Sequence, residues 1–118
     1  MKTNIAIVKS KKFAIRIVNL CKYLNETKNE RILSNQILRS GTSIGANLAE
    51  SECSPTKKDF VNKVYISLKE CNETIYWLDL LYETEYIQKS MYDSLKFDCL
   101  ELKKILQSTT KTINIPIE

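Results

Sequence analysis

Only two glycines and two prolines occur among the 118 residues of this chain, so long stretches contain no residue that interrupts a helix. Both prolines, Pro55 and Pro116, lie outside the segments with regular apolar spacing. A β-sheet protein of this size needs many tight turns, and glycine and proline are the residues that usually form them. The scarcity therefore predicts long α-helices. Apolar residues make up 43% of the chain, enough to bury the core of one domain spanning residues 1–118.

Apolar residues recur at helical spacing in four segments, at about residues 8–26, 34–52, 57–84 and 88–112. Ser34 is the expected N-cap of the second segment, and Thr56 and Asp59 have the spacing of a capping box before the third. The connections are short, and short connections place successive helices side by side in opposite directions. The sequence predicts an all-α fold, an antiparallel up-down-up-down four-helix bundle.

The third segment carries more apolar surface than one core-facing stripe requires. The stripe predicted to face the core consists of Phe60, Val64, Leu68, Cys71, Ile75, Leu78 and Tyr82. Off this stripe lie five further large residues, namely Tyr65, Ile66, Tyr76, Trp77 and Leu80. Aromatic residues outside the core are typical of protein interfaces, so this set predicts the interface of a homo-oligomer. The alternative is that these are singly exposed apolar residues without a role.

Both glycines lie in the segment SGTSIGANLAES, residues 40–51. Gly45 is followed by Ala46 and Asn47 instead of the lysine and hydroxyl residue of a Walker loop, so a phosphate-binding loop is excluded. Glycine costs about 1 kcal/mol relative to alanine inside a helix. A regular apolar stripe nevertheless continues through Gly41 and Gly45, formed by Leu33, Ile37, Ile44 and Leu48. The two glycines therefore predict the close approach of a neighbouring helix.

A polar stripe runs beside these glycines. It consists of Arg39, Ser43, Asn47 and Glu50, at spacings that make them neighbours on one helix face. We interpret it as a network that ties the second helix to an adjacent one, with Asp98 of the fourth segment as a candidate partner. Ligand binding by the same residues is the alternative.

The residues that most often carry catalysis are scarce. The chain has no histidine, and its four cysteines, Cys21, Cys53, Cys71 and Cys99, are scattered singly. A zinc site and a Ser-His or Cys-His pair are therefore not expected, and we predict no catalytic residue, metal or cofactor. No stretch has the length and apolarity of a signal peptide or a membrane span, which predicts a cytoplasmic protein without membrane contact.

Positive charge is concentrated at the start of the chain. The first 31 residues contain eight basic and two acidic residues, while the whole chain has a net charge of +4. Five basic residues of the first predicted helix are candidates for nonspecific phosphate contacts with nucleic acid, with RNA as the expected ligand: Lys9, Lys11, Lys12, Arg16 and Lys22. The alternative is that these side chains only keep an exposed helix face soluble.

Three runs carry a family resemblance: FAIRIVNLCKYL, ILSNQILRSGTSIGANLAES and KKDFVNKVYISLKECNETIYWLDLLYETEYI. Over about residues 9–110 the chain resembles the bacterial family of 23S ribosomal RNA intervening-sequence proteins, with LRSGTSIGANLAE the most specific part. The resemblance implies a four-helix bundle that assembles into a homo-oligomer, with a pentamer around a central channel as the expected assembly, and no catalytic residue. A similar branch, the accessory variability protein of diversity-generating retroelements, implies nucleic acid and a reverse transcriptase as partners.

Two functions are therefore expected for a non-enzymatic oligomer of this kind. The first is nonspecific binding of nucleic acid through the basic residues of the first helix. The alternative is a protein-binding oligomeric scaffold without nucleic-acid binding, in which the basic helix docks on an acidic surface.

Overall fold

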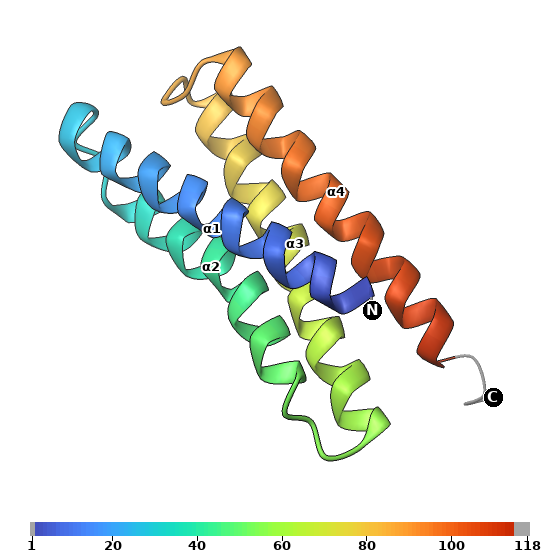
Figure 1. The fold of residues 1–118 in the computed structure, drawn as a ribbon. Coiled ribbons are helices and arrows are strands. Elements are labelled where there is room, and N and C mark those ends of the chain that lie inside the picture. The colour runs from blue at the N-terminus through green and yellow to red at the C-terminus, as the bar shows by residue number, and fades with distance from the viewer. Residues whose placement is uncertain (1, 115–118) are drawn as a thin grey trace.

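The computed structural model describes the backbone of residues 2–114 and the side chains of residues 5–111. Four long helices account for nearly all of it: α1 (Lys2–Thr27), α2 (Ile32–Ser51), α3 (Lys57–Glu83) and α4 (Lys89–Asn114) (Figure 1). Residues 2–114 contain no strand, which confirms the prediction of an all-α fold. The first helix begins earlier than its predicted start at residue 8, because Ala6 is buried and Ile7 packs against the core.

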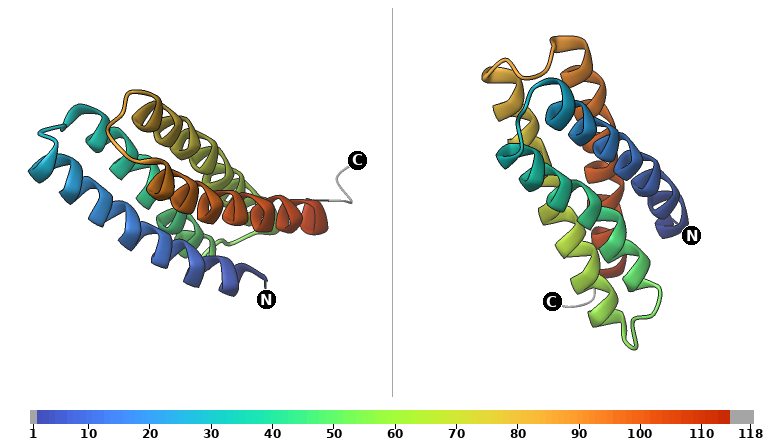
Figure 2. Two further views of the ribbon diagram at one scale, coloured as in Figure 1. Left: turned by 90° about the horizontal axis from the view of Figure 1, so that it is seen from above. Right: turned by 90° about the vertical axis from the view of Figure 1, so that its left-hand side faces the viewer.

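The four helices form an elongated bundle with dimensions of 48 × 22 × 21 Å. Each helix packs on the next one along the chain, and α4 returns to α1. Within the described residues, α1 and α3 are diagonal across the bundle and do not pack side by side, and the same holds for α2 and α4. The left view in Figure 2 shows α1 and α3 at opposite edges of the bundle. The outward faces of α1 and α3 therefore point in opposite directions.

The two glycines of α2 lie against α1. A methyl group at Gly41 would lie 2.9 Å from both Cγ atoms of Ile17, and one at Gly45 would lie 3.0 Å from Oγ of Ser10. Both distances are shorter than an ordinary van der Waals contact. The later residue of α1, Ile17, meets the earlier glycine of α2, Gly41, and the earlier Ser10 meets the later Gly45. The two helices therefore run in opposite directions.

The face of α3 that enters the core differs from the predicted stripe. Val61, Ser67, Thr74 and Leu81 are buried together with Val64, Cys71 and Leu78, whereas Phe60, Leu68, Ile75 and Tyr82 are only half-buried. The physical reason is hydrogen bonding between helices. Ser67 Oγ donates to the Ile44 carbonyl oxygen at 2.9 Å, and Thr74 Oγ1 lies 2.9 Å from Ser40 Oγ. These small polar residues rotate α3 towards α2, which a count of apolar residues alone misses.

The helix starts give one confirmed and one wrong prediction. At the start of α3, the Asp59 amide donates to Thr56 Oγ1 at 3.0 Å, so Thr56 is the N-cap as predicted. Ser34 is not the N-cap of α2, because it lies inside the helix and is buried. The Glu30 carboxylate, only 8% exposed, accepts hydrogen bonds from the amides of Ile32, Leu33 and Ser34 at 2.8–3.1 Å. A carboxylate at this place also interacts favourably with the helix dipole.

Candidate interaction surfaces

The side of α1 that faces α4 carries two ion pairs. Arg16 Nη1 lies 2.7 Å from Asp98 Oδ2, and Lys9 Nζ lies 3.4 Å from Glu101 Oε2. The expectation that Asp98 joins the polar stripe of α2 is therefore wrong, since α2 and α4 are diagonal within the described bundle. Two of the five cations predicted to contact phosphate already have a carboxylate partner. They can bind a phosphate only by exchanging that partner.

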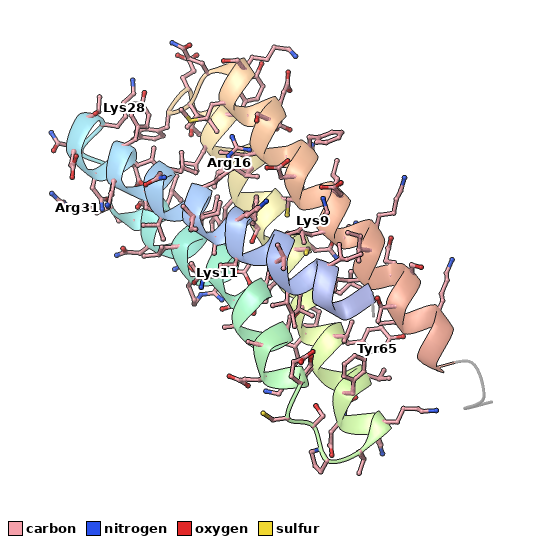
Figure 3. All side chains as sticks on the ribbon, viewed as in Figure 1. Lys9, Lys11, Arg16, Lys28, Arg31 and Tyr65 are labelled. Atoms are coloured by element: carbon pink, nitrogen blue, oxygen red, sulfur yellow. The ribbon has the colours of Figure 1, made fainter. Side chains whose placement is uncertain are left out.

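The other three predicted cations, Lys11, Lys12 and Lys22, are exposed and have no ion pair within residues 5–111. Figure 3 shows Lys9 and Arg16 on the α4 side of α1 and Lys11 on the opposite side, towards α2. The five residues thus do not share one surface. Lys9 and Arg16 lie beside α4, whereas Lys11 lies towards α2.

The outward face of α1 carries exposed aliphatic residues that are not among the predicted site residues. Val8 is 56% exposed, Ile15 54% and Val18 37%. Spacings of three and seven residues place them on one face of the helix, and Lys11 and Lys22 share it. Their apolar character was visible in the sequence. However, the alternation with lysine made this face resemble an ordinary solvated one.

On α3, three of the five predicted interface residues are exposed: Tyr65, Ile66 and Tyr76, with Tyr76 at 58%. Trp77 and Leu80 do not project freely into solvent, because both are half-buried. Trp77 packs against the core and donates from Nε1 to Glu73 Oε2 at 3.0 Å. It also packs edge-to-face on Tyr76, with ring centroids 5.0 Å apart. Trp77 therefore supports the position of Tyr76.

The polar stripe of α2 meets α3 at its two ends. Arg39 pairs with both Glu73 and Glu70. At the other end, Glu50 Oε1 lies 2.6 Å from Lys63 Nζ. Between these ends the stripe bonds to its own helix, since Ser43 Oγ donates to the Arg39 carbonyl and Asn47 Nδ2 to the Ser43 carbonyl. The stripe connects α2 with α3 and leaves no cluster of free polar groups for a ligand.

The comparisons with known proteins agree with this all-helical architecture. The model of the family described as 23S rRNA-intervening sequence protein matches residues 2–108. The chain belongs to this family.

One solved structure extends the likeness from sequence to fold. It is a protein with unknown function from the S23 ribosomal protein family of Bacteroides thetaiotaomicron VPI-5482. That protein is 52% identical to this chain, with a TM-score of 0.93, and the match covers 94% of this chain and 99% of the other. None of the curated proteins matches the chain. The resemblance to 23S rRNA intervening-sequence proteins is thus confirmed.

The cysteines of this 23S rRNA-intervening sequence protein are free, and only Cys53 is exposed. Burial raises the pKa of Cys21, and hydrogen bonding to Cys99 together with burial raises the pKa of Cys71 far above its ordinary value. These buried thiols are therefore poor nucleophiles. Cys53 borders a hollow of about 520 Å³ between the end of α2 and the start of α3, lined also by Pro55, Lys63 and Ile66.

In the part of the chain that the structure describes, histidine, cysteine and carboxylate side chains nowhere gather into a group that could hold a metal ion. None of the helices within the described residues combines the length and the apolarity needed to cross a membrane.

Proposed function

We propose that this member of the 23S rRNA-intervening sequence protein family is a non-enzymatic, homo-oligomeric protein of the cytoplasm, whose outward helix faces bind other protein chains. The observation that carries the proposal is the exposed aliphatic face of α1, where Val8, Ile15 and Val18 alternate with lysines. Phosphates gain nothing from aliphatic neighbours, whereas a protein surface buries them at a gain of about 25 cal/mol per Å². A pentamer is the assembly that the family resemblance implies.

The polar groups of the bundle support a role without catalysis. The chain has no histidine, and many charged side chains form ion pairs between neighbouring helices. The buried hydroxyls of Ser67 and Thr74 bond to α2. These groups stabilise the bundle, and they do not converge on one position where a substrate could react.

The mass of the protein in solution tests this proposal. Light scattering at micromolar concentration should give a multiple of the 13.7 kDa chain mass, five-fold for a pentamer. The mass should persist at high salt, because apolar contacts are not screened as ionic ones are. A mass of one chain at all concentrations would contradict the proposal.

Nucleic-acid binding is the second candidate function, favoured by the three unpaired cations Lys11, Lys12 and Lys22. Repeating them around an oligomer would multiply a weak attraction. A labelled single-stranded RNA of mixed sequence should then bind with an affinity that falls with salt, with a logarithmic slope of about −0.7 for each phosphate contacted.

A pair of double variants separates RNA binding from general charge effects. Lys11→Glu with Lys12→Glu should abolish RNA binding, whereas Lys57→Glu with Lys58→Glu, an equal charge change on exposed residues of α3, should reduce it only slightly. Absence of binding at low salt, or equal effects of the two double variants, would remove this candidate and leave the protein-binding function alone.

A further inference from the structure

Exposed large apolar residues lie on the outward faces of two diagonal helices, α1 and α3, and also at Phe97 and Leu100 of α4. We define the α1 face as Val8, Ile15 and Val18, and the α3 face as Tyr65, Ile66 and Tyr76. Because α1 and α3 lie diagonally across the described bundle and these two faces point away from each other, a single chain cannot bury one face against the other. Each face is therefore open to contact with another molecule.

We propose that the α1 face of one copy packs on the α3 face of a second copy, in a head-to-tail contact repeated around the oligomer. This inference rests on the proposed self-association and specifies its geometry. A two-fold symmetric contact joins identical patches, so it would bury the α1 faces or the α3 faces and leave the other pair in water. A head-to-tail contact buries one of each at every interface, and it closes into a ring when the rotation between copies allows.

The positions of the two faces along the bundle fit this contact. Ser10 of α1 lies against Gly45, and the adjacent Ile44 accepts the hydrogen bond of Ser67 in α3. One layer further, Ile17 lies against Gly41, next to Ser40, whose hydroxyl bonds to Thr74. These two layers join residues 8–18 of α1 to residues 65–76 of α3. The faces thus overlap along the rod, and neighbouring copies lie side by side instead of end to end.

The charges around the two faces are complementary. Lys11, Lys12 and Lys22 border the α1 face, and α1 has no acidic residue before Glu26. The second half of α3, residues 70–83, carries four acidic residues and no basic one. Of these four, Glu83 is exposed and has no ion pair within residues 5–111, so it is available to a lysine of the next copy.

Lys69 is the one basic residue between Tyr65 and Tyr76. Its long stem can cover apolar surface while its ammonium group reaches the edge of the contact. The charge complementarity is therefore centred on the second half of α3, where Tyr76 lies.

Mixing two defective variants tests the head-to-tail contact. Ile15→Lys spoils only the α1 face, and Tyr76→Lys spoils only the α3 face. Both side chains are more than half exposed, so both variants should keep the helical circular dichroism of the wild type. Each variant alone should scatter light as a single 13.7 kDa chain. Mixed in equal amounts, they should form a one-to-one pair, because each supplies the face that the other lacks, and the remaining two lysine-bearing faces repel.

Phe97→Lys is the matched control. Phe97 on α4 is 68% exposed and belongs to neither face, so this variant should assemble as the wild type does. Continued assembly of Ile15→Lys or Tyr76→Lys alone would overturn the proposed pairing. A mixture that stays monomeric would show that the contact is not head-to-tail. A wild-type protein that is itself a single chain would instead refute the self-association on which the pairing rests.

A cross-linking measurement gives the same answer without disrupting the contact. In a Cys53→Ser background the remaining thiols are buried, so one new cysteine per chain can be modified selectively. A chain with Ile15→Cys and a chain with Tyr76→Cys, mixed and treated with a short bis-maleimide, should yield a cross-linked pair. Cross-linking of each variant to itself with equal yield would contradict the pairing of unlike faces.

Discussion

Replacement of Gly41 by alanine adds one methyl group at the contact between α2 and α1. That methyl carbon would lie 2.9 Å from Cγ1 and from Cγ2 of Ile17. Carbon atoms pack best at about 3.5–4.0 Å, so the contact would be too short by more than half an ångström. Ile17 cannot rotate away, because it is fully buried and its branched side chain has one strongly preferred rotamer in a helix.

Two effects of opposite sign determine the expected change in stability. Alanine is favoured over glycine within a helix by about 1 kcal/mol. Overpacking a close contact costs about 1–3 kcal/mol. We therefore expect Gly41→Ala to lower the free energy of unfolding by up to about 2 kcal/mol, whereas an uncrowded site would gain about 1 kcal/mol. Gly41→Leu, which adds three more carbons at the same place, should unfold the bundle.

Urea unfolding followed by circular dichroism, at one fixed protein concentration, measures this change. Gly45→Ala is the comparison variant: its methyl group would lie 3.0 Å from Ser10 Oγ, which donates to the Ile7 carbonyl, and this single milder contact should cost less stability than the contact at Gly41. Ile17→Ala removes both crowding atoms, so Gly41→Ala should cost less in that background. If Gly41→Ala were more stable than the wild type by about the full helix-propensity gain, the close-packing explanation would be refuted.

Four further predictions concern individual contacts. Glu30→Ala leaves three amides at the start of α2 without their carboxylate and should lower the free energy of unfolding by about 1–3 kcal/mol in thermal melts; an unchanged melting temperature would contradict the capping role. A thiol reagent should modify one cysteine, Cys53, rapidly, and the buried Cys71 only on unfolding. Rapid modification of all thiols would exclude the burial of Cys71. Because folding raises the pKa of Cys71, the free energy of unfolding should also fall as the pH rises above 9.0, the pKa of this thiol in the unfolded chain. Arg16→Ala should cost less than about 1 kcal/mol, since its pair with Asp98 is partly exposed to solvent, and a larger loss would assign the pair a structural role.

The sequence allowed the exposure of some site residues to be predicted, but not their partners on other helices. Exposure of Tyr65, Ile66 and Tyr76 could be predicted because they project off a helical stripe, which is a local property of α3. The partner of Asp98 could not be predicted, because Arg16 is 82 positions away in the sequence and meets it only where α1 and α4 pack. The basic residues of α1 were read together as one surface, yet packing does not leave them on one surface.

The sequence by itself determined the four helices, the cap at Thr56 and the scarcity of catalytic groups, because each depends on residue type and spacing within one segment. Tertiary structure decided the rotation of α3 through Ser67 and Thr74, and which residues the glycines of α2 meet on α1. It also decided which cations are neutralised by carboxylates and which apolar residues stay exposed. The physical reason is that helical periodicity defines faces within a helix but not the axial offset or rotation between helices, which depend on side-chain packing between them.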